Sequence, residues 1–293
     1  ELSANERTIA KRLLMEITNR LSYLNEVGLE YLTLNRLSNT LSGGESQRIN
    51  LATSLGSSLV GSLYILDEPS IGLHSRDTHR LIGVLQNLKK QGNTVIVVEH
   101  DEDIMKASDH IIDMGPEAGT NGGEVVFTGD VNELVSKGKS LTADYLRGDK
   151  KIVRQALKKI GKDKVVVQGA RAHTLNNVDV AFPLRCFTVV SGVSGSGKST
   201  LVKNILYPAL QKEMGGFPSV PVGEHDSIAG DIKTIGAVEF VDQNPIGKSS
   251  RSNPVTYIKA YDEIRELFAM QPLSKQRGYK PSHFSFNVDG GRC

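Results

Sequence analysis

The sequence predicts an α/β fold in which helices flank a mostly parallel sheet. Short apolar runs alternate with amphipathic helical segments along the chain, which is typical of α/β domains. A glycine-rich stretch at 192–199 lies between an apolar run and a helical pattern, and an apolar run at 63–66 ends in two acids, Asp67 and Glu68. Because ligands bind beyond the carboxyl ends of parallel strands, these two stretches are the first candidates for a site.

The elements of the first part follow from its apolar spacing. Apolar residues recur at helical spacing from Ile9 to Leu24, which predicts a helix over 6–26. Further helices are expected at 45–58, 75–91 and 101–107. Strands are expected at 63–66, 94–98, 110–114 and 124–128.

The stretch 147–163 is rich in Lys and Arg and has no strong strand pattern, so we interpret it as a linker between parts 1–146 and 164–293. In the second part, strands are expected at 164–168, 178–182, 186–191 and 237–241, and helices from Lys198 and over 256–270. The stretch 211–235 resembles a loop, and the tail from 271 lacks periodicity.

Composition narrows the class of protein. The formal charge of +2, from 35 basic and 33 acidic residues, neither requires nor excludes a nucleic-acid partner. The two cysteines, Cys186 and Cys293, are too far apart to suggest a disulfide framework. No apolar run approaches the roughly 18 residues that span a bilayer, so we expect a cytoplasmic protein without a membrane partner. The chain opens within a helical pattern and stops at Gly-Gly-Arg-Cys, so we treat it as part of a longer one.

The stretch 192–199 matches the pattern G-x-x-x-x-G-K-[ST]. Glycines let such a loop curl so that several backbone N–H groups point at one phosphate, and the following helix directs its N-terminal dipole at the same anion. Lys198 is expected to reach the β- and γ-phosphates, and Ser199 to bind Mg²⁺. The expected nucleotide-binding residues of this loop are Gly192, Ser194, Gly195, Ser196, Gly197, Lys198, Ser199 and Thr200.

Two acids follow the strand expected at 63–66. An Mg²⁺–nucleotide site needs one carboxylate near the metal and another to orient the attacking water. We assign Asp67 to the first role and Glu68 to the second, although a solvated strand end would carry the same residues. His100 follows the next expected strand and could contact a γ-phosphate, although taken alone it is as readily a polar residue at a strand end.

Ser42, Gly43 and Gly44 open the helix expected at 45–58. A serine and two glycines at a helix N-terminus form either a second anion cradle or an ordinary serine cap.

The motif L-S-G-G-E-x-Q-R at 41–48, followed by an apolar strand and D-E-P, resembles the signature and Walker B motifs of ATP-binding-cassette ATPases. The resemblance implies that His100 is the switch histidine and that Gln243, in the Q-loop, contacts Mg²⁺ and takes part in catalysis. It also implies that Ser42, Gly43 and Gly44 cap a γ-phosphate held by an opposing cassette.

The motif order differs from that of a single cassette, because the signature and Walker B precede the phosphate loop. The simplest interpretation is two complementary half-cassettes of a tandem protein. Residues 66–74, 97–103 and 241–247 resemble the damage-sensing ATPase family of the excision-repair excinucleases. In that family the chain continues into a zinc module, and Cys293 is the first of its ligands; four ligands are needed, so zinc binding requires residues beyond this chain.

The resemblance implies a homodimeric, Mg²⁺-dependent ATPase that recognises lesions in duplex DNA and loads the helicase-like and nuclease subunits of the excinuclease. It implies that Lys198 shares a site with the signature turn, whereas Asp67, Glu68 and His100 serve another site, so this chain alone completes neither. The halves could instead close into one permuted cassette, with Lys198 beside Asp67.

Other interpretations stay open. A transporter-associated cassette, a DNA- or partner-docking module without turnover and a phosphotransferase using the phosphate loop alone each account for part of the motifs. Lys248, Arg251, Lys275, Arg277 and Lys280 are candidate DNA contacts or simply solvated surface, and His173 is a weak candidate for an adenine contact.

Overall fold

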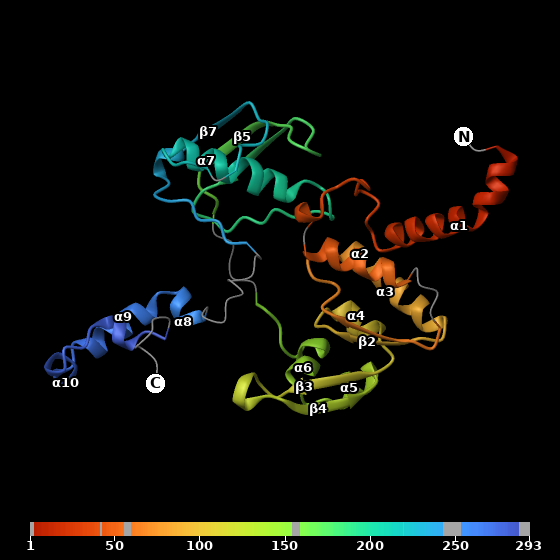
Figure 1. Ribbon diagram of the computed structural model, residues 1–293, viewed down its shortest axis with the longest axis horizontal. Coiled ribbons are helices and arrows are strands. Elements are labelled where there is room, and N and C mark those ends of the chain that lie inside the picture. Colours follow the sequence, from red (N-terminus) through yellow and green to blue (C-terminus); the bar gives the residue numbers. More distant parts are fainter. Residues whose placement is uncertain are drawn as a thin grey trace. The chain divides into compact units, whose positions relative to one another are not determined.

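The computed structural model describes residues 3–41, 43–55, 60–153, 159–218, 220–242 and 253–286. The chain forms two compact units, Glu1–Gly236 and Ala237–Cys293, coloured along the sequence in Figure 1.

The first unit opens with α1 (Ala4–Glu26), whose N-terminus is capped by Ser3. The Ser3 hydroxyl accepts from the Glu6 N–H and the Glu6 carboxylate accepts from the Ser3 N–H, so two orphan donors are satisfied. A turn of 3₁₀ helix, η1 (Ser38–Thr40), leads to α2 (Gly43–Leu55).

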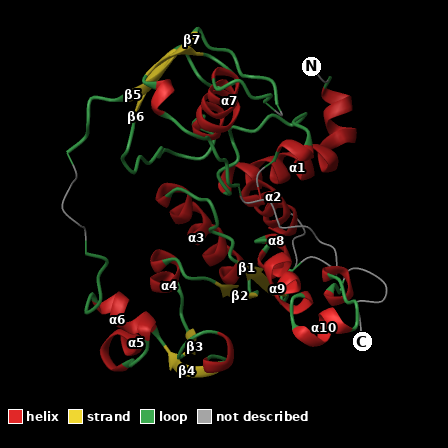
Figure 2. Ribbon diagram, turned by 90° about the vertical axis from the view of Figure 1, so that its left-hand side faces the viewer, coloured by secondary structure: helices red, strands yellow, loops and turns green. Residues whose placement is uncertain are grey.

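The parallel pair β1 (Leu63–Asp67) and β2 (Thr94–Val98) packs against α3 (Ser75–Lys90), beside it in Figure 2. Alternate strand residues face this core because strand side chains alternate between faces. The other face is exposed: Ile65 is 68% accessible. Buried side chains of the cluster are Val27, Leu29, Leu51, Ala52, Leu81, Val84, Leu85, Leu88 and Ile104, the last from α4 (Glu102–Ala107).

The antiparallel pair β3 (Ile111–Gly115) and β4 (Glu124–Gly129) forms a second small layer, with η2 (Gly119–Asn121) in its connection. Helices α5 (Val131–Lys137) and α6 (Leu141–Arg147) follow. Ile111, Leu134 and Ala143 bury one another here.

A three-stranded antiparallel sheet of order β6-β5-β7 forms the next layer, from β5 (Lys164–Ala170), β6 (Val178–Pro183) and β7 (Ser227–Gly230). Its core packs on η3 (Thr200–Leu206), a π-helical stretch that continues into α7 (Tyr207–Glu213), and η4 (Ile232–Thr234) follows β7. β7 lies inside the stretch predicted to be loop.

The second unit contains α8 (Pro254–Tyr257), α9 (Ala260–Ala269), α10 (Pro272–Gln276) and η5 (Pro281–Phe284). The rings of Tyr261 and Phe286 are in contact, tilted by 46° with centroids 4.7 Å apart, and the Tyr261 hydroxyl donates to the Phe284 carbonyl at 2.8 Å.

The α/β class is confirmed, but the strand pairing differs from the expectation. Among the described strands only β1 and β2 pair in parallel, and the other pairs are antiparallel. The strands predicted at 186–191 and 237–241 are wrong, because neither stretch is paired into a sheet. An extended run becomes a strand only when a neighbouring strand accepts its backbone bonds, and Phe187 in the first of these runs is 95% exposed.

Candidate nucleotide-binding site

The phosphate loop follows the extended stretch after β6 and curls through three glycines with positive φ. Gly192, Gly195 and Gly197 have φ of 147°, 77° and 93°. A Cβ at Gly197 would lie 2.8 Å from the Leu175 side chain, so this close approach requires glycine. The sequence thus forms the tight turn that a phosphate cradle needs.

The Lys198 ammonium donates to the carbonyls of Gly192 and Val193, both at 2.8 Å, so it lies across its own loop. Helical backbone begins at Lys198, and the Leu201 N–H bonds back to the Gly197 carbonyl at 2.9 Å. Ser199 is exposed in the first turn, Thr200 starts η3, and Ser194 and Ser196 lie within the loop. The arrangement presents a cation, a hydroxyl and a helix N-terminus together, which fits an Mg²⁺-bound polyphosphate.

The two acids lie at the carboxyl end of β1. Glu68 has φ of 45°, and its N–H bonds to the Val98 carbonyl at 2.9 Å. Its Oε1 lies 3.9 Å from Nδ1 of His100, and both side chains are accessible. The structure therefore brings Asp67, Glu68 and His100 to one edge of the β1–β2 pair.

Glu99 holds together the two loops at this edge. No role was assigned to it from the sequence. Its carboxylate accepts from the backbone N–H groups of Ser70, His100 and Asp101 at 2.8, 3.0 and 3.2 Å. Burial raises the pKa of Glu99, but these hydrogen bonds outweigh burial and lower the pKa below its ordinary value. Glu99 thus joins the loop after Pro69 to the loop that carries His100.

The first turn of α2 is held close to the end of β1. A Cβ at Gly44 would lie 2.7 Å from the Ile71 carbonyl oxygen, so the backbones approach as closely as glycine allows. The Gln47 amide donates to the Asp67 carbonyl at 2.5 Å. These contacts fix the signature helix against the segment that follows the acids.

A buried polar cluster beneath the first turn of α2 was also missed from the sequence. Arg48, only 4% exposed, donates to the carbonyls of Gly44, Val27 and Gly28. The Tyr31 hydroxyl donates to Oε1 of Glu45 at 2.7 Å, and Glu45 is 7% exposed. The sequence shows Glu and Arg four positions or fewer from the glycine pair, but nothing in it indicates that Tyr31 reaches them.

The Tyr31 ring also lies against the phosphate loop. A Cβ at Gly195 would be 2.6 Å from Cδ2 and 2.7 Å from Cγ of this ring. The tip of the loop at 192–197 is therefore next to the segment that supports the first turn of α2.

Some sequence-predicted residues cannot be placed. Ser42, Gln243 and Cys293, and the basic candidates Lys248 and Arg251, lie outside the described residues. Gly43 opens α2, His173 is exposed with φ of 52°, and within the described ranges no cluster of three or more His, Cys, Asp or Glu side chains could hold a metal ion. No helix in the described part of the chain is long and apolar enough to cross a membrane.

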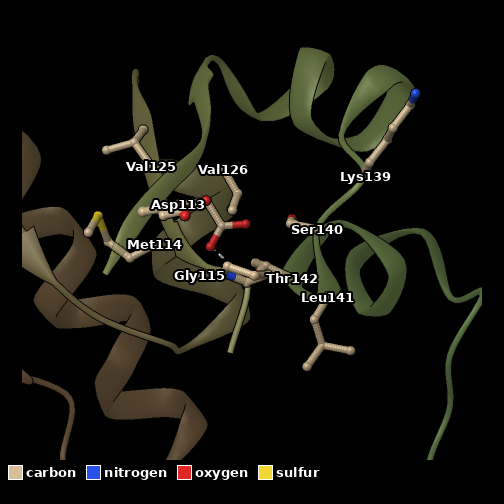
Figure 3. Close-up of a pocket in the computed structure, with 11 residues that line it drawn as sticks. Asp113, Met114, Gly115, Val125, Val126, Lys139, Ser140, Leu141 and Thr142 are labelled. Carbon is tan, nitrogen blue, oxygen red and sulfur yellow. Dashed lines mark hydrogen bonds between the residues drawn. The ribbon is translucent and has the colours of Figure 1, made fainter. Parts of the chain in front are cut away.

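A cavity of about 320 Å³ lies beside β3, β4 and the start of α6 (Figure 3). Asp113 lines it and accepts a hydrogen bond from the Thr142 hydroxyl at 3.0 Å. The cavity contains none of the sequence-predicted site residues, so the candidate site is the phosphate loop together with the turns around it.

Comparison with known proteins identifies the relatives of this chain. It is 52% identical over 295 residues to UvrABC system protein A of Streptomyces avermitilis, covering all of this chain and 29% of that protein. The same protein of Thermus thermophilus is 52% identical over 286 residues, covering 97% of this chain and 30% of the relative. The chain belongs to the UvrA family.

A solved structure extends the similarity to the fold. UvrA2 from Deinococcus radiodurans superposes with a TM-score of 0.90 at 43% identity, over 99% of this chain and 35% of that one. No family model matches the sequence. The chain therefore spans about 30% of the length of the curated UvrA relatives that it matches.

Proposed function

We propose that this chain supplies parts of two composite ATP sites of a UvrA protein, a DNA-damage-recognising ATPase of nucleotide excision repair. The observation that supports the proposal best is the Tyr31 ring against Gly195, because it puts the tip of the phosphate loop beside the element that supports the first turn of α2. This favours the arrangement in which a nucleotide on Lys198 faces Ser42, Gly43 and Gly44 over a permuted cassette with Lys198 beside Asp67.

In the first site, the backbone N–H groups of residues 192–199 and the Lys198 ammonium bind the phosphates. Thr200 lies in the first turn of the helix that follows this loop. The ammonium exchanges its two loop carbonyls for phosphate oxygens, which are stronger partners because the bonds are charge-assisted. Ser199 and Gln243 would hold Mg²⁺, and the ion would supply positive charge against the phosphates.

In the second site, Glu68 would orient and deprotonate the attacking water, Asp67 would help to hold Mg²⁺ and His100 would contact the γ-phosphate. The distance of 3.9 Å between Glu68 Oε1 and His100 Nδ1 supports this assignment, because both side chains can then lie close to the same phosphate group. The phosphate loop of this site would come from other residues of the parent protein, so we expect little hydrolysis by this chain alone.

For the parent protein we propose ATP-controlled binding of duplex DNA that carries lesions, as a homodimer in the cytoplasm, with loading of the helicase-like and nuclease subunits in turn. The relatives named UvrABC system protein A support this role. Shape and deformability of the duplex, more than base sequence, would select the target. Zinc would be bound only with ligands beyond Cys293.

The proposal is tested by titrating the 293-residue chain with a fluorescent ATP analogue and Mg²⁺. Lys198→Ala should weaken binding about 10- to 100-fold, since hydrogen bonds to charged groups contribute about 1.5–3 kcal/mol. Lys212→Ala is the matched control, because it removes an exposed lysine of α7. Equal dissociation constants for all three proteins would contradict the proposal, and binding that persists without hydrolysis supports the incomplete-site interpretation.

A further inference from the structure

We propose that Tyr31 is a positioning residue that links the phosphate loop to the first turn of α2, so that a nucleotide bound at 192–199 orders this first turn. This inference rests on the composite nucleotide site proposed above. It assigns a role to a residue outside the sequence motifs.

The first contact is steric. Three adjacent carbons of the Tyr31 ring, Cδ2, Cγ and Cε2, would lie 2.6, 2.7 and 2.9 Å from a Cβ at Gly195. Real side chains do not approach this closely, so the ring occupies the space that any residue other than glycine would need. Gly195 has φ of 77°, which glycine adopts readily, and it lies at the tip of the turn proposed to bind phosphate.

The second contact is a hydrogen bond to the signature helix. The Tyr31 hydroxyl donates to Glu45, which lies in the first turn of α2. The hydroxyl also lies 3.5 Å from the Arg48 guanidinium, whose Nε donates to the Gly44 carbonyl at 3.2 Å. One side chain therefore contacts the loop at its ring, and its hydroxyl contacts Glu45 and Arg48 in α2.

The chemistry of the hydroxyl suits this link. Burial, followed by the hydrogen bond to Glu45, raises the pKa of Tyr31 to about 12. The phenol therefore stays protonated at neutral pH and can donate to Glu45.

The effect of Tyr31→Phe distinguishes a tyrosine that only fills space from one that couples the phosphate loop to α2. Tyr31→Phe keeps the ring against Gly195 and removes the hydroxyl, with its bond to Glu45 and its contact with Arg48. If the ring alone mattered, this variant would behave like the parent chain. If the link matters, the first turn of α2 becomes independent of the nucleotide.

Hydrogen–deuterium exchange of the whole chain tests the link, with Mg²⁺ and a non-hydrolysable ATP analogue at saturation. In the unsubstituted 293-residue chain (the parent chain of the variants below), the analogue should slow exchange of the backbone amides at 43–48 at least about threefold. Tyr31→Phe should lose most of that slowing, while its affinity for the analogue stays within about threefold of the parent value. Glu45→Gln, which keeps an acceptor oxygen for the hydroxyl, should retain it.

Tyr23→Phe is the control, because Tyr23 packs on the first core cluster; thermal melting checks that each variant is folded. Full slowing at 43–48 in Tyr31→Phe, or no slowing in a parent chain that binds the analogue, overturns this inference and leaves the nucleotide site standing. A parent chain that binds no analogue overturns both proposals.

Discussion

Replacing Gly195 by alanine separates the two reasons for a glycine at the tip of the phosphate loop. The alanine must adopt φ near 77°, and its Cβ must also displace the Tyr31 ring, whose nearest carbon would be 2.6 Å away. Gly215 offers a matched control, because its φ is 78° and nothing lies within 4 Å of a Cβ built there. Left-handed backbone costs an alanine about 1–2 kcal/mol at either position.

Only Gly195→Ala adds steric overlap, which typically costs about 1–3 kcal/mol when neighbours must shift. We therefore expect Gly195→Ala to lower the free energy of unfolding by about 1–3 kcal/mol more than Gly215→Ala does. Urea denaturation of both variants measures the difference.

Combining each glycine variant with Tyr31→Ala completes the test, because removing the ring should erase the extra loss at Gly195 and leave Gly215→Ala unaffected. Equal losses for the two single variants would show that the Tyr31 ring causes no steric overlap at Gly195, and so would an extra loss at Gly195 that survives in the Tyr31→Ala background.

Three further predictions test other parts of the structure. Glu99→Gln should destabilise the chain at neutral pH, because the folded-state pKa of Glu99 lies below the unfolded-state value near 4.5 and the carboxylate therefore contributes stability above that value; urea melts at falling pH should show the difference shrink below pH 4.5 and disappear once pH has passed the lowered folded-state pKa. Leu134→Ala should cost about 2–5 kcal/mol, since this side chain is fully buried, whereas exposed Leu13→Ala should change the unfolding free energy little. Gly44→Ala, which would place a Cβ 2.7 Å from the Ile71 carbonyl, should weaken binding of an ATP analogue less than Lys198→Ala but lower the melting temperature more.

Local pattern was sufficient to predict much of the first unit. The strand 94–98 is predicted at its observed bounds, and α3 differs by one residue, because each buries alternate or helically spaced apolar side chains against a partner in the same part of the chain. The run at 186–191 has the same apolar character but no paired neighbour, and apolar character alone cannot supply one.

The candidate site also has parts that the sequence predicts and parts that it does not. The glycines of the phosphate loop follow from the motif because backbone geometry demands them. The contacts of Tyr31 with Glu45, 14 residues away, and with Gly195 depend on how distant segments pack. Glu99 was visible as an acid at a strand end, but one of the three backbone N–H groups that it holds, that of Ser70, comes from the loop after Pro69, about 30 residues earlier in the chain.

In the proposed arrangement, a nucleotide on the phosphate loop faces the first turn of α2. An ATP analogue with a photoreactive group on its γ-phosphate, irradiated with the dilute 293-residue chain and Mg²⁺ and mapped by peptide mass spectrometry, measures this directly. Labelling is expected within 41–48 and should be abolished by Lys198→Ala. Labelling concentrated at 67–71 instead, with 41–48 unmodified, would rule out this arrangement and favour a permuted cassette.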